Sequence, residues 1–296
     1  MIYKNDPELN TPYVLTADIG GSHITAAVCD LKTNTIIDQS LIRTEVMSKG
    51  HASQIFSTWG QALSKSAQLS GVEISGLGLA MPGPFDYEKG ISCIKGLNKY
   101  EALFGMDVRH KLAESLTLDP NRIKFLNDAE ATIAGEAMSG AGSGYKNFVG
   151  VTLGTGFGSA HCLNGQTKDL NWGSLPFKDS IADDFLSTRW FQRRYHELTG
   201  ISISGVRELA QQADQSQTSR QLFKEFAINM ADFLSTLLAD IEPETLILCG
   251  NITKASRLFL PELSKRINVP EIRLAGLGET AALIGAAGQF ETVSLT

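Results

Sequence analysis

The sequence predicts an α/β protein of two domains, and three observations support this prediction. The chain has 296 residues, about twice the usual length of one domain. Short apolar runs typical of strands are interspersed with runs at helical spacing. A pattern of strand, glycine turn and strand occurs twice, about one domain apart, which indicates an internal duplication. We place the domains at residues 1–126 and 127–296, with the C-terminal helix packing back on the first domain.

Composition and charge exclude several classes of protein. Lys and Arg number 26 against 32 Asp and Glu, so the chain lacks the basic excess of a nucleic-acid binder. No apolar run approaches the length of about 18 residues that a membrane span needs, and the N-terminus lacks a signal-peptide pattern. The four cysteines lie far apart without CxxC spacing, as in a reducing compartment. We therefore expect a cytoplasmic protein that binds neither nucleic acid nor membranes.

The first domain begins with a predicted hairpin. Apolar strands are expected at residues 13–18 and 24–29, joined by a turn at Gly20 and Gly21, and a third strand at 35–42 extends them into a meander. The elements expected next are a helix at about 52–69, a strand at 74–81 that ends in Pro82-Gly83-Pro84, a helix at 109–116 and a strand at 123–126.

The second domain contains the second hairpin and a mainly helical remainder. Its strands are expected at 148–153 and 157–163, on either side of a glycine turn. Apolar residues at three- and four-residue spacing predict a core-facing helix over 222–241. A strand at 245–249 follows, and a last helix from near Glu279 is rich in small residues that permit close packing.

The turn of the first hairpin is a candidate phosphate site. Gly20 and Gly21 leave backbone N–H groups open to an anion, and Ser22 adds a hydroxyl donor. Asp18, at the strand end, is placed to hold a hydrated Mg²⁺. On this segment alone, a plain hairpin turn explains the residues equally well.

The turn of the second hairpin offers the same chemistry. Gly154, Thr155 and Gly156 form a polar loop whose exposed amides suit phosphates, although such a sequence occurs in many turns. Together the two turns indicate two sides of one nucleotide triphosphate site. Gly250 and Asn251 follow a strand, where a base and ribose would pack.

Asn127 and Asp128 stand between a strand and a helical run that begins at Ala129. A carboxylate at the C-terminal end of a strand lies at the ligand-binding edge of an α/β sheet, where it can accept a proton from a substrate hydroxyl. The alternative is that Asp128 merely caps the helix, since Asp is a preferred N-cap residue.

In order and spacing, these segments resemble the ROK family of sugar kinases and repressors, from about residue 14 to 288. Asp18-Ile-Gly-Gly-Ser22 is similar to the family's first phosphate motif, DxGGT, with Ser22 in the Thr position. Leu126-Asn127-Asp128-Ala129, followed by Gly135-Glu136, resembles its most specific motif, LNDAxxxxxGE. Residues 80–84 and 154–156 match the family's PGP and second phosphate motifs, and Gly250-Asn251 resembles its adenosine motif, which usually has two glycines.

The resemblance implies a two-domain actin-like (ribonuclease H-like) ATPase fold with a cleft between the domains, and ATP with Mg²⁺ as cofactors. It implies that Asp128 is the general base and that Asn127 binds a sugar hydroxyl; we expect Gly83, Asn98 and Asp183 to contact the sugar as well. The residues expected to bind the cofactors are Asp18, Gly20, Gly21, Ser22, Gly154, Thr155, Gly156, Gly250 and Asn251. A homodimer is the usual state of similar proteins.

The chain departs most from the family pattern in one region. Asn171 and Ser174 stand where similar proteins carry the Glu and His of an ExGH motif, and the zinc-binding cysteine run is absent. We therefore expect no zinc site, with Asp183 as a shortened stand-in for a sugar-binding Glu. The departure bears on the choice of sugar and not on phosphoryl transfer.

These observations predict an ATP-dependent, glucokinase-like hexose kinase that acts on the 6-hydroxyl of glucose. Another hexose (N-acetylmannosamine, fructose or allose) and polyphosphate as the donor stay open. A second hypothesis is a sugar-sensing protein that keeps the fold without the reaction, against which the intact Asp128 argues. A third, a chaperone-like or filament-forming ATPase, lacks support because such proteins need extra subdomains. A repressor is not expected, because the first strand begins too early for a preceding DNA-binding segment.

Overall fold

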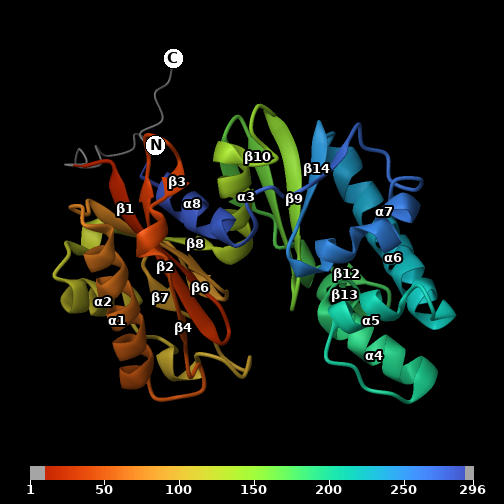
Figure 1. The fold of residues 1–296 in the computed structure, drawn as a ribbon, viewed down its shortest axis with the longest axis horizontal. Helices are drawn as coiled ribbons and strands as arrows, with labels where there is room; N and C mark the ends of the chain where they lie inside the picture. Colours follow the sequence, from red (N-terminus) through yellow and green to blue (C-terminus); the bar gives the residue numbers. More distant parts are fainter. Residues whose placement is uncertain (1–10, 291–296) are drawn as a thin grey trace. The chain divides into compact units, whose positions relative to one another are not determined.

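The computed structural model describes residues 11–290 (Figure 1). The chain divides into two compact units, each built around one main sheet. Unit 1 comprises residues 1–138 and 279–296, and unit 2 comprises residues 139–278. In the part of the chain that is described, no helix is both long and apolar enough to cross a membrane.

The described residues of unit 1 form a six-stranded sheet and four α-helices. Its elements are β1 (Tyr13–Ile19), β2 (His23–Asp30), β3 (Thr35–Ile36), β4 (Ile42–Glu45), α1 (Ala52–Ser70), β5 (Gly76–Met81), β6 (Phe85–Asp86), β7 (Ile91–Ser92), α2 (Val108–Leu116), β8 (Ile123–Asn127), α3 (Asp128–Ser139) and α8 (Ala281–Gly288). The strand order is β3-β2-β1-β5-β8, with β4 also paired to β2. Strands β1, β5 and β8 are parallel, whereas β1 and β2 form an antiparallel hairpin.

Helices cover both faces of this sheet (Figure 1). On one face, Leu15 of β1 and Leu79 of β5 belong to the same apolar core as Trp59 of α1. On the other face the residues of β5 are small (Gly76, Gly78 and Ala80), which lets α8 lie directly on the backbone of this strand. A Cβ at Gly78 would overlap the carbonyl oxygen of Ala286. The C-terminal helix therefore packs on the first unit.

Helix α3 belongs to unit 1, because it touches α8 backbone to backbone. A Cβ at Gly285 would overlap the carbonyl oxygen of Ala131 and lie 2.6 Å from the amide nitrogen of Gly135. The domain boundary expected after residue 126 therefore differs from the division between the compact units, which falls after Met138.

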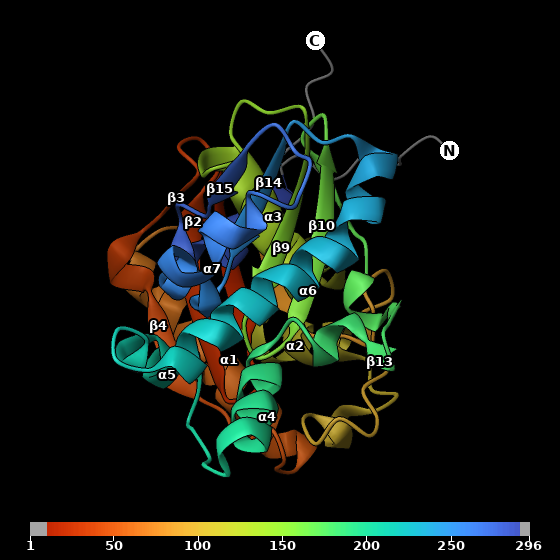
Figure 2. The ribbon, with the colours of Figure 1, turned by 90° about the vertical axis from the view of Figure 1, so that its right-hand side faces the viewer.

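Unit 2 is built on a five-stranded sheet of order β11-β10-β9-β14-β15. Its elements are β9 (Asn147–Leu153), β10 (Phe157–Leu163), β11 (Gln166–Asp169), β12 (Pro176–Phe177), β13 (Ser180–Ile181), α4 (Thr188–Thr199), α5 (Val206–Gln212), α6 (Gln217–Ile241), β14 (Thr245–Cys249), α7 (Ser256–Leu263) and β15 (Ile272–Leu274). Strands β9, β14 and β15 are parallel, and β9 and β10 form the second hairpin. Figure 2 shows the long helix α6 running across this sheet.

The core of unit 2 is rich in aromatic side chains. Phe226 of α6 packs against Trp190 and Phe191 of α4, with ring centroids 5.9 and 4.8 Å apart, and against Phe259 of α7 at 5.4 Å. These rings and Val151 of β9 belong to one buried cluster. The sheet edge that carries the β9–β10 turn is thus fixed to the helices of its own unit.

The predicted elements agree with the structure except in two places. The strand expected over 35–42 is wrong, because the chain forms the two-residue β3, a 3₁₀ turn and then β4. The reason is Ser40, whose buried hydroxyl donates to the carbonyl of Ile37 at 2.6 Å and accepts the N–H of Val28 at 2.8 Å. Helix α6 begins at Gln217, before the expected residue 222, because the Ser216 hydroxyl caps it at the N–H of Ser219.

Candidate active site

The carboxyl ends of three parallel strands bring the expected residues of unit 1 together. Asp18 of β1 is in register with Ala80 of β5, and Met81 is in register with Asn127 of β8. All three strands end at the same edge of the sheet, which is where α/β sheets bind ligands. The glycine turn after β1, the segment after β5 and the start of α3 therefore meet at this edge.

The β1–β2 turn is held by hydrogen bonds at its base. The Gly20 N–H donates to the carbonyl of His23 at 2.9 Å, and the Tyr100 hydroxyl donates to the carbonyl of Gly20 at 2.6 Å. Gly21 and Ser22 are exposed at the tip, and the Ser22 hydroxyl lies 2.9 Å from Nδ1 of His23. The base of the turn is fixed while its tip faces solvent, as an anion-binding turn requires.

Asp18 lies in an unfavourable environment for a carboxylate. Burial, and next the negative charge of Asp128, raise the pKa of Asp18 from 3.8 to about 6. Glu279 adds to the rise in this pKa, whereas the guanidinium of Arg43 opposes it. Arg43 also forms an ion pair with Glu279 at 3.2 Å. The end of β1 therefore combines three carboxylates and one cation within electrostatic reach of one another.

Asn127 and Asp128 have different roles at the start of α3. The Asn127 side-chain oxygen accepts the N–H of Ala129 at 2.9 Å and that of Glu130 at 3.3 Å, so Asn127 caps the helix. The Asp128 carboxylate accepts the N–H of the adjacent Ala129 at 2.8 Å, and the residue is exposed. The alternative role that we considered for Asp128, the helix cap, is thus filled largely by its neighbour. The amide nitrogen of Asn127 donates to the Tyr87 hydroxyl at 3.2 Å.

Two further sugar contacts were expected in unit 1, at Gly83 and Asn98. Gly83 follows β5 at the same edge, and a Cβ at this position would lie 3.4 Å from the Tyr87 hydroxyl. Asn98 is exposed in a loop with a positive φ of 56°, and its N–H donates to Glu101 at 2.8 Å. Gly83 thus joins the cluster of Asn127 and Tyr87, and both sugar contacts stay predictions.

In unit 2, the same strand-edge geometry brings the turn of the second hairpin beside Gly250. Strands β9 and β14 are parallel neighbours, with Thr152 in register with Cys249. Gly250 has a φ of 90°, and a Cβ there would overlap the carbonyl oxygen of Leu153. Only glycine meets both requirements, so this residue type is dictated by the backbone. Asn251 begins the 3₁₀ turn that follows.

The exposed tip of the second hairpin carries Thr155 and Gly156. At its base, the Gly154 N–H donates to the carbonyl of Gly156 at 3.0 Å. The Asp183 carboxylate reaches this hairpin as well, because its Oδ1 accepts the N–H of Phe157 at 2.5 Å. Its Oδ2 pairs with Arg189. The expected sugar contact of Asp183 stays a prediction, beside a contact to the turn that the sequence did not indicate.

Sequence reasoning missed several residues around these edges. Arg43 and Glu279 surround Asp18, Tyr100 supports the first turn, and Arg189 pairs with Asp183. None of these residues belongs to a motif that we used, because the packing of the fold brings each of them to the site, whereas their spacing in the sequence does not indicate it.

Metal binding can be considered from the donor sets present. The carboxylates of Asp18 and Asp128 are the hard oxygen donors that Mg²⁺ prefers, and a cation would relieve the unfavourable ionisation of Asp18. Among residues 11–290, no group of three or more His, Cys, Asp and Glu side chains could hold a metal ion by itself. The four cysteines are not paired in disulfides. The expected absence of zinc stays a prediction.

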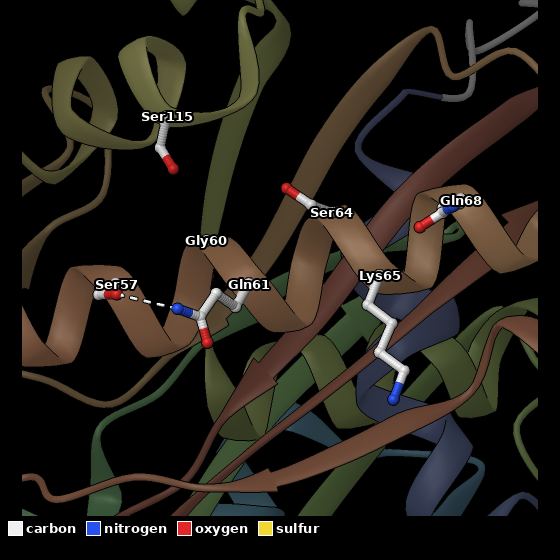
Figure 3. A pocket seen from close by; sticks show the side chains of 7 residues that line it. All are labelled: Ser57, Gly60, Gln61, Ser64, Lys65, Gln68 and Ser115. Carbon is white, nitrogen blue, oxygen red and sulfur yellow. Dashed lines mark hydrogen bonds between the residues drawn. The ribbon is translucent and has the colours of Figure 1, made fainter.

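A hollow at the surface of unit 1 contains none of the expected residues. Figure 3 shows that it is lined by one side of α1 and by a single residue of α2: Ser57, Gly60, Gln61, Ser64, Lys65, Gln68 and Ser115. The Gln61 amide donates to the Ser57 hydroxyl at 3.2 Å (Figure 3). Gly60 allows α2 to approach, since a Cβ there would overlap the Ser115 hydroxyl. The hollow is therefore a consequence of helix packing.

Curated relatives and solved structures resemble this chain over most of its length. An N-acetyl-D-glucosamine kinase of Haemophilus influenzae is 23% identical over 74% of this chain and 82% of its own. An N-acetylgalactosamine kinase of a Shewanella strain is 22% identical over 91% of this chain and 94% of its own. A glucokinase of Thermotoga maritima is 24% identical over 73% of this chain and 79% of its own.

The fold is that of solved ROK structures. A ROK hexokinase of Thermus thermophilus superposes with a TM-score of 0.78 at 21% identity, over 93% of this chain and 96% of that chain. A ROK glucokinase of Streptomyces griseus, solved with glucose and AMPPNP, superposes with a TM-score of 0.77 at 20% identity, over 94% and 98%. The ROK family profile matches residues 14–173, more than half of the chain. The chain belongs to the ROK family.

Proposed function

We propose that this protein is an ATP-dependent sugar kinase that transfers the γ-phosphoryl group to a hexose hydroxyl. One observation carries the proposal, namely that an exposed Asp128 and the Asp18 glycine turn lie at the same strand edge of unit 1. Phosphoryl transfer needs positioning and charge stabilisation more than covalent chemistry. The three relatives named above are sugar kinases, and their names support the same class of reaction.

The site residues at the strand edge of unit 1 each have a role in this proposal. Asp128 accepts the proton of the sugar hydroxyl, and Asn127, fixed by its helix cap and by Tyr87, orients the ring. Asp18 holds Mg²⁺ through water, and the ion when bound neutralises phosphate charge. Gly20, Gly21 and Ser22 face the phosphates.

Unit 2 supplies the rest of the nucleotide site in this proposal. The turn of Gly154, Thr155 and Gly156 binds phosphate oxygens through its amides. Gly250 and Asn251, next to this turn at the end of β14, contact the adenosine. The AMPPNP complex of a similar structure supports this choice of donor.

For the acceptor, we propose the 6-hydroxyl of glucose, with N-acetylhexosamines as the competing class. A glucokinase and a glucose complex among the similar proteins support glucose. Kinases for N-acetylglucosamine and N-acetylgalactosamine support the competing class. We further propose a cytoplasmic homodimer, which sedimentation of the purified protein tests.

The test is ADP release in a coupled assay with Mg-ATP and a panel of sugars. The panel holds glucose, mannose, fructose, allose, N-acetylglucosamine, N-acetylgalactosamine and N-acetylmannosamine. Loss of a general base lowers turnover about 10²–10⁴-fold, so Asp128→Ala should lose at least that much. Asp38→Ala, an exposed carboxylate of the same unit, is the matched control and should keep full turnover. Turnover that survives in Asp128→Ala contradicts the assigned base.

A sugar-sensing protein without kinase activity is the competing function. Asn171 and Ser174, which stand at the departure from the family pattern, are both exposed, and the Ser174 hydroxyl donates to the Asn171 carbonyl at 2.9 Å. Equilibrium binding of a sugar, with no ADP release for any member of the panel, would favour the sensor.

A further inference from the structure

A short segment of unit 2 holds the turn of the second hairpin at both of its ends. Before the turn, the carbonyl of Gly154 accepts the N–H of Thr188 at 2.8 Å. After the turn, the N–H of Phe157 donates to Oδ1 of Asp183 at 2.5 Å. The second carboxylate oxygen of Asp183 pairs with Arg189. Residues 183–189 thus fix the backbone on either side of the exposed Thr155 and Gly156.

We propose that Asp183 and Arg189 position this turn for the phosphates of the nucleotide and that Asp183 does not contact the sugar. The inference rests on the proposed function, because it deepens the assignment of the turn as a phosphate site. It gives Asp183 a role different from the one that its place in the sequence suggests, and it adds Arg189 to the site.

The geometry around Asp183 supports a positioning role. Both of its oxygens are engaged inside unit 2, and its side chain is only 20% exposed. Each oxygen already has a partner, and the burial of the side chain leaves little access for a sugar hydroxyl to the remaining lone pairs. The approach is close, because a Cβ at Gly156 would lie 3.0 Å from Oδ1 of Asp183. Amides that are fixed in advance bind an anion without the cost of ordering the loop.

The charge of Asp183 explains why Arg189 is needed. A carboxylate next to a phosphate-binding turn repels the polyphosphate unless a cation neutralises it. Arg189, the second residue of α4, supplies that cation, and more than half of its side chain is exposed. The pair therefore holds the turn without adding net negative charge to it.

The test measures KM for ATP and KM for the accepted sugar separately in purified variants. Asp183→Ala frees the Phe157 N–H, and we expect KM for ATP to rise at least tenfold while KM for the sugar stays within threefold. Asp183→Asn keeps an oxygen for that N–H and carries no charge, so it should recover most of the loss. Arg189→Ala leaves the carboxylate unneutralised and should raise KM for ATP at least threefold.

The coupling between the two residues gives a sharper criterion. In the Asp183→Asn background there is no carboxylate to neutralise, so Arg189→Ala should add less than twofold to KM for ATP. Matched controls come from the same two segments. Asp184→Ala removes the neighbouring carboxylate, which accepts the Ser180 hydroxyl, and Arg194→Ala removes another arginine of α4, which pairs with Glu225 of α6. Both controls should leave KM for ATP within twofold.

Direct binding of AMPPNP, measured by calorimetry, separates this inference from the proposed function. If the wild-type protein binds AMPPNP but phosphorylates no sugar, the kinase proposal fails, and weaker binding by Asp183→Ala still supports the inference. A raised KM for the sugar with an unchanged KM for ATP would overturn the inference and restore the sugar contact. If Asp183→Ala does not fold, unchanged AMPPNP binding by Arg189→Ala overturns it instead.

Discussion

Replacing Asp18 by Asn should make the metal-free protein more stable at neutral pH. The carboxylate pays an electrostatic penalty there, since burial and the charge of Asp128 raise its pKa from 3.8 to about 6. The protonated form of Asp18 carries no such penalty, so the Asp18 carboxyl group contributes most to the stability of the folded state at pH values below 3.8. This contribution is lost as the pH rises through about 6. At about 1.36 kcal/mol per pH unit, the shift corresponds to at most about 3 kcal/mol of unfolding free energy above pH 6. Asn has the same shape without the charge and removes this cost.

The assay is urea unfolding of the wild type and Asp18→Asn in EDTA, without nucleotide, at pH 7.5 and pH 4. We expect the variant to gain up to about 3 kcal/mol at pH 7.5, and the gain to fall below about 1 kcal/mol at pH 4, where the wild-type carboxyl is largely protonated. Asp38→Asn, at an exposed position of the same unit, should show no such gain. A variant that is no more stable than the wild type at pH 7.5, or a gain of equal size at pH 4, would refute the electrostatic argument.

Two other predictions concern packing and a partly buried imidazole. Gly285→Ala should destabilise the protein by about 2–3 kcal/mol in urea unfolding, because the new Cβ would overlap the backbone of Ala131. The control is Gly60→Ala, whose Cβ would overlap the Ser115 hydroxyl. This hydroxyl can rotate away, so the control should lose less unfolding free energy. Equal costs would show that backbone contact is not the cause. Burial lowers the pKa of His161, whose ring Nε2 lies 2.7 Å from Oδ1 of Asn147. As the pH falls, the His161 imidazole is therefore protonated in the unfolded chain at a higher pH than in the folded protein. The free energy of unfolding should thus decrease as the pH drops below about 6.5. His161→Gln should reduce this slope in urea unfolding between pH 7.5 and 5, and an unchanged slope would exclude His161 as its source.

Much of the candidate site could be predicted from the sequence because it is local. The two glycine hairpins lie where expected, and β8 delivers Asn127 and Asp128 directly to the start of α3. Strand alternation and glycine turns act over a few residues, so their pattern is visible in the sequence alone. The prediction of one strand over 35–42 was wrong for an equally local reason, namely the hydrogen bond that the Ser40 hydroxyl donates to the carbonyl of Ile37, three residues earlier.

The choice between two roles for Asp128 needed side-chain geometry. An Asp at the start of a helix is as consistent with a cap as with a base. The structure shows Asn127 accepting the N–H groups of Ala129 and Glu130, which a cap requires. Asp128 is therefore exposed at the strand edge without being needed to start the helix.

By itself, the sequence determined the family motifs, their order and the residues at the ends of the strands. Only the tertiary structure placed Arg43 against Glu279, 236 residues away, and Tyr100 against Gly20, 80 residues away. It also decided that Asp183 reaches the second turn and pairs with Arg189. Such contacts depend on how helices and strands pack, and no local pattern of residues encodes them. Motifs therefore identify the chemistry of the site, whereas the fold supplies the charges and hydrogen bonds that tune it.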